Sequence, residues 1–488
     1  MKRTLRKAEI RHRFYNMPVP KTLPGGTVPA GPSQAGRRIG CGKLGLIFFL
    51  ISMVSLGAFT LPVWAATVKA RTEIQFWHAM EGQLGESVSE LVKRFNLSQE
   101  AFEVKAVYKG TYPEVQAAAI KAYRQKNQPH IVQVFEIGSQ SMATSDTIIP
   151  VYRLMKQQQV EINWNDFIET VTGYYSKDNR LSSLPFNVST PILFYNKEVF
   201  RQAGLGDTPP ATWQEVESAS KKILASGAAP CGFTAAWPSW TMVDNMFSWH
   251  DQPYATNRNG YTGLDTKLLI NSRFGLMHIG ALAGWQKENV FSYGGSLREA
   301  DPKFINGECA MIMDTSAFIG LHGSSLKFEW GTGQVPHWGP PYSKASSLLG
   351  GASLWVLKGH PPSDYKGVAQ FLKFLTEPNQ QMWWASTTGF VPITRAAVKG
   401  LKDAGFYERN PEQWTAMSQF LNAPPTPNSR GIRLGNYTQI REVIDSELAD
   451  IFTGRKTVKE GLDAAVIRGN AILREFSIIN GASPQGEI

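Results

Sequence analysis

Two carboxylic acids, Glu136 and Asp314, could perform acid–base chemistry if the fold brought them into one cleft. Paired carboxylates hydrolyse glycosides by protonating the leaving group and by activating water or attacking the sugar. The motifs Gly-x-Ser-x-Gly, the phosphate-binding glycine loop and His-Glu-x-x-His are missing after residue 65, as is the dinucleotide glycine pattern. A phosphoesterase usually also shows a metal cluster or a nucleophile with its base. We therefore expect a protein that is not an enzyme and has no cofactor or metal, and an exported phosphoesterase or glycosidase is the less favoured alternative.

Three predicted strands must position the candidate side chains of the first part of the chain. Residues 73–77, 102–108 and 130–135 have strand patterns, and amphipathic helices are predicted between them. Their starts lie about 29 residues apart, which is the size of a βαβ unit and predicts a parallel, doubly wound sheet in an α/β protein. Ligands bind such sheets beyond the carboxyl ends of the strands. The side chains that follow these strands are Trp77, His78, Tyr112 and Glu136.

The rest of the chain indicates a second lobe and a return to the first one. Residues 184–195 form an extended segment with two prolines, which we interpret as a crossover between lobes. Residues 309–313 follow an Asn-Gly turn, and residues 350–356 are entered through two glycines; both segments are predicted strands. The predicted organisation is an export signal with a basic extension (1–65), the first part of lobe 1 (66–185), the first part of lobe 2 (186–308), a crossover and return to lobe 1 (309–365), and C-terminal helices that complete both lobes (366–488).

The positive charge of the chain is concentrated at its N-terminus. The sequence has 50 basic and 40 acidic residues, and its first 65 residues contain ten of the basic residues and one acidic residue. The remainder therefore has 40 basic and 39 acidic residues. This balance argues against nucleic acid as a partner.

The N-terminal segment has the order of an export signal. A basic stretch at 37–43 precedes an uncharged apolar run of 20 residues, 44–63, and small residues lead to a cleavage point between Ala65 and Ala66. The run is also long enough to span a bilayer, so a retained membrane anchor is the alternative to cleavage. In both cases the basic flank stays in the cytoplasm and the remainder crosses the membrane, which predicts a periplasmic protein.

Two cysteines, Cys231 and Cys309, remain in the exported part. An isolated pair in an oxidising compartment favours a disulfide, and two buried free thiols are the alternative.

Several motifs resemble those of the periplasmic sn-glycerol-3-phosphate-binding proteins, which are the solute-binding subunits of bacterial ABC importers within extracellular solute-binding protein family 1. The similarity extends without large gaps from about Thr72 to Phe476, and it includes residues 74–82, 108–112, 133–138, 172–176, 350–356 and 431–436. The resemblance implies a two-lobed type II periplasmic binding protein fold that closes on its ligand about a hinge. It also implies a small phosphorylated polyol as ligand, membrane permease subunits as partners, and a monomer.

The resemblance assigns ligand contacts to nine positions of this chain. Two of them depart from the family pattern, since Thr315 replaces a serine and keeps a hydroxyl, whereas Phe390 replaces a tyrosine and loses one. If that tyrosine contacts phosphate, the loss costs about 1.5 to 3 kcal/mol and leaves the preference for monoester or diester open. The nine positions are Tyr112, Glu136, Ser189, Trp237, Trp240, Thr315, Gly351, Phe390 and Arg441.

The chemistry of a glycerol phosphate suits these residue types. Arg441 offers a planar fork to phosphate oxygens, and Gly351 allows close approach of a backbone N–H. Glu136 can accept hydrogen bonds from hydroxyls, while Trp237 and Trp240 can stack on the carbon chain. Each residue also has a structural alternative, such as a surface ion pair, a strand-entry turn or packing in the core. An oligosaccharide-binding protein of the same fold is the second functional hypothesis.

Overall fold

The computed structural model describes residues 70–177, 180–342, 344–421 and 423–481. The predicted export signal, with its apolar run and cleavage point, lies outside the described residues. Among the helices of the described ranges, none combines the length and apolar character needed to cross a bilayer. All the elements discussed below belong to the unit that begins at Arg71.

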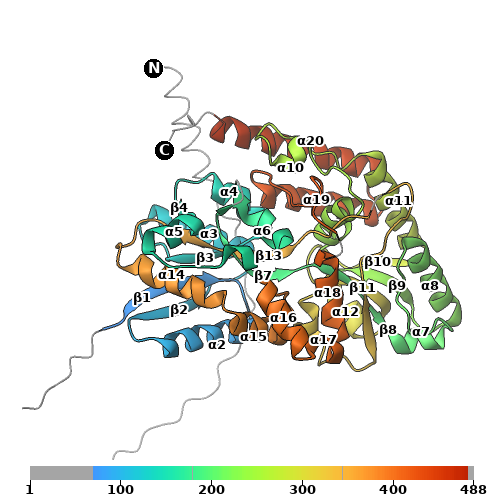
Figure 1. Cartoon of the computed structure of the whole chain (residues 1–488). Helices are drawn as coiled ribbons and strands as arrows, with labels where there is room; N and C mark the ends of the chain where they lie inside the picture. Colours follow the sequence, from blue (N-terminus) through green and yellow to red (C-terminus); the bar gives the residue numbers. More distant parts are fainter. Residues whose placement is uncertain (1–69, 178–179, 343, 422, 482–488) are drawn as a thin grey trace, which may run out of the picture. The chain divides into compact units, whose positions relative to one another are not determined.

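The first sheet contains the three strands expected from the beginning of the sequence. β1 pairs in parallel with both β2 and β3, as the βαβ spacing predicts. A strand from much later in the chain, β13, then pairs antiparallel with β3, β4 and β7, so the sheet is parallel only on one side (Figure 1). Its strands are β1 Thr72–His78, β2 Phe102–Tyr108, β3 Ile131–Phe135, β4 Ile148–Ile149, β7 Leu184–Ser189 and β13 Gly350–Leu357.

Helices with apolar stripes pack around this sheet. The predicted stripe of α2 is buried through Leu84, Val88, Leu91 and Phe95. α3 begins with a capping box between Thr111 and Glu114. The helices of this part are α2 Gly82–Ser98, α3 Tyr112–Arg124, α4 Ser139–Ala143, α5 Val151–Gln158, α6 Glu169–Tyr175, α14 Asp364–Leu375, α15 Pro378–Thr388, α16 Arg395–Asp403 and α17 Phe406–Arg409, with the short turns η1 Glu136–Gly138 and η2 Trp164–Asp166 and the hairpin β5 Ser176–Lys177 and β6 Arg180–Leu181.

The second sheet has the order β10-β9-β11-β8-β12. β9 is parallel to both β10 and β11, whereas β8 is antiparallel to β11 and β12. Every residue of β8, β9 and β11 is buried, which is typical of strands covered on both faces. The strands are β8 Pro191–Asn196, β9 Cys231–Ala235, β10 Phe291–Tyr293, β11 Cys309–Thr315 and β12 Trp330–Gly333.

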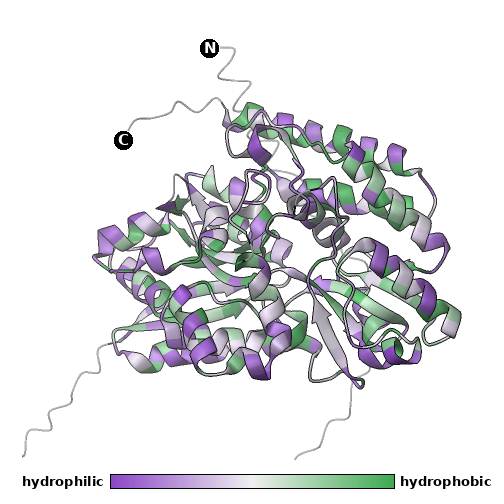
Figure 2. Ribbon diagram, turned by 45° about the vertical axis from the view of Figure 1, so that its right-hand side comes forward, coloured by the Kyte–Doolittle hydropathy of each residue, from purple (hydrophilic) through white to green (hydrophobic). Residues whose placement is uncertain are grey.

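The helices around the second sheet come from the middle and the end of the chain. α19 and α20 share their apolar core with α8 and α11 (Figure 1). Helical ribbons alternate between hydrophilic and hydrophobic residues along their length (Figure 2), as expected for helices with one buried face. These helices are α7 Lys197–Gln202, α8 Trp213–Ser226, α9 Asn245–Trp249, α10 Thr256–Gly260, α11 Arg273–Lys287, α12 Asp301–Ile305, α13 Phe318–His322, α18 Pro411–Leu421, α19 Tyr437–Phe452 and α20 Val458–Asn480, with the π-helical turn η3 Ser239–Asp244.

The predicted crossover segment 184–195 joins the two sheets. It consists of two strands: β7 belongs to the first sheet, and β8, after Thr190, belongs to the second. Thr190 itself is fixed by the amide of Ser316, which donates to its carbonyl oxygen over 2.9 Å. The chain returns to the first sheet at Gly350. The lobe boundaries given by the sequence stay predictions, although this path agrees with two crossings between the sheets.

Candidate ligand-binding site

The predicted site residues lie at the carboxyl ends of parallel strands in both sheets. In the first sheet, Tyr112 begins the helix after β2 and Glu136 follows β3 directly. In the second sheet, Trp237 follows β9, and Thr315 is the last residue of β11. This is the edge at which open α/β sheets bind ligands.

Arg441, on α19, connects these two groups of residues. Its Nη1 donates to Oε1 of Glu136 over 2.8 Å, and its Nη2 donates to Oδ2 of Asp244 over 2.5 Å. The Arg441 side chain is 14% exposed, while those of Glu136 and Asp244 are 6% and 1% exposed. Burial raises the pKa of both carboxyl groups, and the guanidinium opposes that rise. One cation is thus shared between two buried acids.

Several buried polar atoms around this bridge have no hydrogen-bond partner in the described part of the chain. Nε of Arg441 and Oδ1 of Asp244 belong to this group. The hydroxyls of Tyr254 and Tyr437 interact with Asp244 and with each other, and both lower the pKa of Asp244, which burial raises. An unpaired buried donor is costly, so Nε of Arg441 is the atom here that a polar ligand would satisfy.

Asp244 was not among the predicted site residues. The sequence signal for it is a single acid within the apolar stretch 242–247, which becomes informative only when that stretch is known to be buried.

Tyr112 is held by a chain of side-chain amides. Its hydroxyl accepts a hydrogen bond from Nδ2 of Asn187 over 2.7 Å, and Oδ1 of Asn187 accepts one from Gln133 over 2.7 Å. The Tyr112 ring stacks on Phe135 with centroids 5.4 Å apart. Burial raises the pKa of the Tyr112 hydroxyl, so this group stays protonated and can donate to a ligand.

The two glycines of β13 bring Ser189 and Trp240 together. Gly350 is the register partner of Ser189, and the Trp240 ring packs against Gly350. Gly351 has φ +93°, and a Cβ there would lie 1.8 Å from the carbonyl oxygen of Asn187. Only glycine fits that position without a shift of the backbone. Ser189 and Trp240 are both buried, and Nε1 of Trp240 lacks a partner among the described residues.

Thr315 lies close to the crossover because it is the register partner of Pro191. Its hydroxyl accepts a hydrogen bond from the amide of Ala317 over 3.3 Å. The adjacent Asp314, which we considered as a second catalytic acid, is fully buried. Burial raises its pKa well above the ordinary value, and the neighbouring Asp301 adds to this rise.

The last two predicted residues differ in their surroundings. Trp237 has a left-handed backbone, φ +51°, and its ring is only partly buried. Phe390 is buried and stacks on Trp384 with centroids 5.8 Å apart, so its ring belongs to the first core. The amide of the next residue, Val391, donates to the carbonyl oxygen of Val188 over 2.8 Å, which places Phe390 close to Ser189. The structure therefore places the nine residues near the carboxyl ends of strands in the two sheets and near the crossover between them. Their ligand contacts stay predictions.

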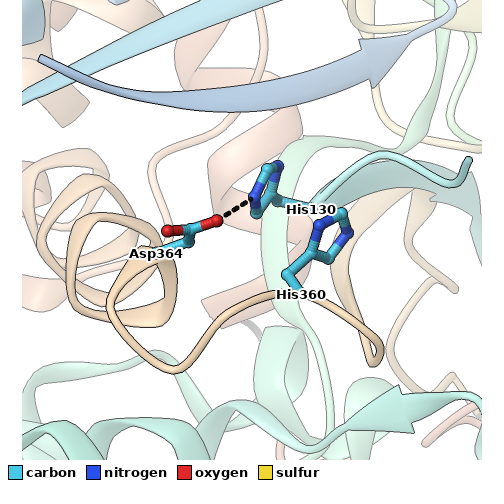
Figure 3. A group of neighbouring side chains, drawn as sticks. All are labelled: His130, His360 and Asp364. Carbon is cyan, nitrogen blue, oxygen red and sulfur yellow. Dashed lines mark hydrogen bonds and ion pairs between the residues drawn. The ribbon is translucent and has the colours of Figure 1, made fainter. Parts of the chain in front are cut away.

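A separate cluster of His130, His360 and Asp364 lies at the opposite end of β3 (Figure 3). Nδ1 of His130 accepts a hydrogen bond from the amide of Gln75 over 3.0 Å, so its proton resides on Nε2, 3.2 Å from Oδ2 of Asp364. The two imidazoles are stacked face to face, 3.7 Å apart. Their lone pairs therefore do not converge on one point, and we do not assign a metal centre here.

The disulfide predicted from the cysteine pair is present. Cys231 and Cys309 are bonded, and their Cα atoms are 4.4 Å apart in adjacent parallel strands. Both residues begin their strands, so the bond lies at the end of the sheet opposite Thr315.

Comparisons with known proteins give a consistent result. A family model described as bacterial extracellular solute-binding protein matches residues 90–415. The sn-glycerol-3-phosphate-binding periplasmic protein UgpB of Yersinia pseudotuberculosis is 42% identical over 88% of this chain and 99% of its own length. UgpB of Escherichia coli K12 is 42% identical over 84% of this chain and 94% of its own length.

Solved structures show the same fold. The crystal structure of UgpB from Mycobacterium tuberculosis in complex with glycerophosphocholine has a TM-score of 0.72 and 20% identity, covering 83% of this chain and 99% of that one. The cyclic alpha-maltosyl-1,6-maltose binding protein of Arthrobacter globiformis has a TM-score of 0.67 and 21% identity, covering 83% of this chain and 100% of that one. These neighbours include both phosphodiester-binding and sugar-binding proteins, so the fold alone does not identify a ligand.

Proposed function

Because the chain belongs to the bacterial extracellular solute-binding proteins, we propose that it captures sn-glycerol 3-phosphate, or a glycerophosphodiester such as glycerophosphocholine, and delivers it to the permease of an ABC importer. It is a binding protein and not an enzyme, so selectivity comes from burying paired polar groups. The 42% identity to proteins named for sn-glycerol 3-phosphate favours this ligand over an oligosaccharide.

The bridge from Arg441 to Glu136 and Asp244 is the observation that carries the proposal. Glu136 follows a strand of the first sheet, Asp244 lies in the turn after a strand of the second, and the buried Nε of Arg441 has no partner among the described residues. A ligand that supplies an anionic oxygen to this guanidinium would satisfy it and hold the two sheets together.

Different parts of the site suit the two ends of a glycerol phosphate. We assign the phosphoryl group to Arg441, the backbone N–H of Gly351 and the hydroxyls of Ser189 and Thr315. We assign the glycerol hydroxyls to Glu136, with Tyr112 as a further donor and with Trp237 and Trp240 against the carbon atoms. Phe390 adds no hydrogen bond in this arrangement.

Relatives named as periplasmic proteins support a location in the periplasm, where this protein would meet the permease. We further propose that an export signal ends at Ala65 and that the mature protein is a monomer. Mass determination of the N-terminus of the secreted protein tests the first of these, since a retained anchor would leave residues 44–63 in place.

Calorimetric titration of the purified protein with sn-glycerol 3-phosphate, glycerophosphocholine and maltose tests the ligand. The proposal predicts binding of at least one phosphorylated ligand and none of maltose. Binding of maltose alone would replace it by the oligosaccharide hypothesis. Binding of the diester alone would show that the loss of the hydroxyl at Phe390 has changed the preferred phosphate ester.

A further inference from the structure

A second arginine, Arg298, lies at the same edge of the second sheet. It belongs to the loop 294–300, which follows β10 directly. Because β10, β9 and β11 are parallel neighbours, this loop shares the carboxyl edge of the sheet with Trp237 and Thr315. Arg298 is not among the predicted site residues, because the strands predicted from the sequence do not include β10.

The loop is fixed to its neighbours by hydrogen bonds. The Trp237 amide donates to the carbonyl oxygen of Leu297 over 2.8 Å, and the Leu297 amide donates to Oε2 of Glu299 over 2.7 Å. The Asp301 amide donates to the carbonyl oxygen of Arg298 over 3.0 Å. The half-buried guanidinium lies 5.8 Å from the centre of the Trp237 ring. The loop that carries Arg298 is therefore bonded directly to the backbone of Trp237.

The charge of Arg298 acts on residues of both sheets. Burial raises the pKa of Tyr112, beside the first sheet, and of Asp314, in the second. The positive charge of Arg298 opposes the rise in both cases. The guanidinium is thus close enough to Tyr112 and to Asp314 for its field to reach both of them, although they belong to different halves of the site.

Arg298 and Arg441 differ in whether a carboxylate of the protein is bonded to the guanidinium. Both Nη atoms of Arg441 are bonded to carboxylates, whereas Arg298 makes no hydrogen bond or ion pair through its side chain within the described residues. The Arg441 bridge contains two acids and one base, so a second cation at this edge would favour binding of an anionic phosphate. Arg298, beside Trp237 at the carboxyl edge of the second sheet, carries such a charge.

We propose that Arg298 binds the phosphoryl group together with Arg441 and gives the site its preference for a phosphate that carries two negative charges. This inference rests on the proposed function and adds a specificity-determining residue to that site. A guanidinium without a protein partner keeps all its donors for phosphate oxygens, and its charge favours a monoester over a diester.

Calorimetry on the variants Arg298→Gln and Arg298→Lys tests the inference, with Arg273→Gln as the matched control. Arg273 is exposed at the first residue of α11, outside the loop 294–300. We expect Arg298→Gln to weaken sn-glycerol 3-phosphate about 10- to 100-fold and glycerophosphocholine less, because the diester carries one charge. Arg298→Lys should retain most of the affinity, and Arg273→Gln should bind as the wild type does.

The outcomes separate this inference from the proposed function. If the wild type binds sn-glycerol 3-phosphate and Arg298→Gln binds it equally well, the role of Arg298 is overturned while the function stands. If Arg298→Gln weakens sn-glycerol 3-phosphate and glycerophosphocholine by the same factor, Arg298 does not set a preference for two negative charges and the inference is also overturned. If the wild type binds neither phosphorylated ligand, the function fails and the inference fails with it.

Discussion

The indole ring of Trp240 lies against the backbone of Gly350, so closely that a Cβ at Gly350 would be 2.3 Å from Cζ2 of the ring. Trp240 comes from the turn after β9 of the second sheet, and Gly350 begins the strand that returns to the first sheet. The contact therefore joins the two halves beside Ser189, the register partner of Gly350.

Gly350→Ala should displace the Trp240 ring. We expect the free energy of unfolding to fall by about 1 to 3 kcal/mol, as for other overpacked cores, and ligand affinity to fall with it. Urea unfolding and calorimetry measure the two effects. Gly284→Ala is the control, because a Cβ at Gly284 on α11 has open space and should leave binding unchanged. Wild-type affinity in Gly350→Ala would contradict a role for this contact.

Arg441→Ala should lower both the free energy of unfolding and the ligand affinity more than removal of an exposed ion pair does. It leaves Glu136 and Asp244 as buried acids without a cation, and loss of one partner from a buried pair costs about 3 to 5 kcal/mol. We expect affinity for sn-glycerol 3-phosphate to fall at least about 100-fold, since bonds to charged groups are worth up to about 3 kcal/mol each. Arg468→Ala removes a half-exposed partner of Glu447 and should cost less than about 1 kcal/mol and keep binding, because Lys456 still pairs with Glu447. Equal effects of the two substitutions would refute the assignment.

Phe390→Tyr restores the hydroxyl found in the related family. The backbone beside Phe390 is bonded to the backbone beside Ser189, while the ring itself packs on Trp384. If the restored hydroxyl reaches the phosphate as the family tyrosine does, one added bond should raise affinity by up to about tenfold. Calorimetry with monoester and diester shows whether the preference changes. A loss of thermal stability without a gain in affinity would mean that this ring serves only to pack on Trp384.

The disulfide should stabilise the second sheet without affecting the ligand. Cys231 and Cys309 close a loop with a sequence separation of 78, and loss of a native disulfide typically costs about 2 to 4 kcal/mol. The double variant Cys231→Ser and Cys309→Ser should unfold at lower urea concentration and retain wild-type affinity. A changed affinity would show that this end of the sheet is coupled to the site.

His250 should make stability depend on pH. Its Nδ1 bonds the carbonyl oxygen of Met246 over 2.8 Å, and its Nε2 accepts a hydrogen bond from the Trp338 amide over 3.0 Å, which fixes a neutral ring. Burial lowers its pKa to about 3. The unfolded chain binds a proton near pH 6.5 and the folded chain does not, so stability is present above pH 6.5 and is lost as the pH falls towards 3.

Urea unfolding at pH 7.5 and 4.5 measures this loss, which is at most about 1.4 kcal/mol per pH unit for one histidine. In His250→Gln the loss should be smaller than in the wild type. An unchanged difference between the two pH values would show that His250 does not contribute to it.

The amino-acid sequence by itself determined the local elements and much of the chemistry. The spacing of apolar residues predicted β1, β2, α2 and α3. This was possible because the period of apolar residues in a strand or helix is set by residues close together in the chain. The cysteine pair and the family motifs predicted the disulfide and the class of protein.

Only the tertiary structure decided which distant residues meet. Arg441 pairs with Glu136 across 305 positions and with Asp244 across 197, and no local pattern encodes either pairing. The same is true of β13, whose antiparallel insertion beside β3 brings Gly351 to Asn187. Arg298 resembles any other arginine in sequence, and it differs only because the fold places it beside Trp237 without an acidic partner among the described residues.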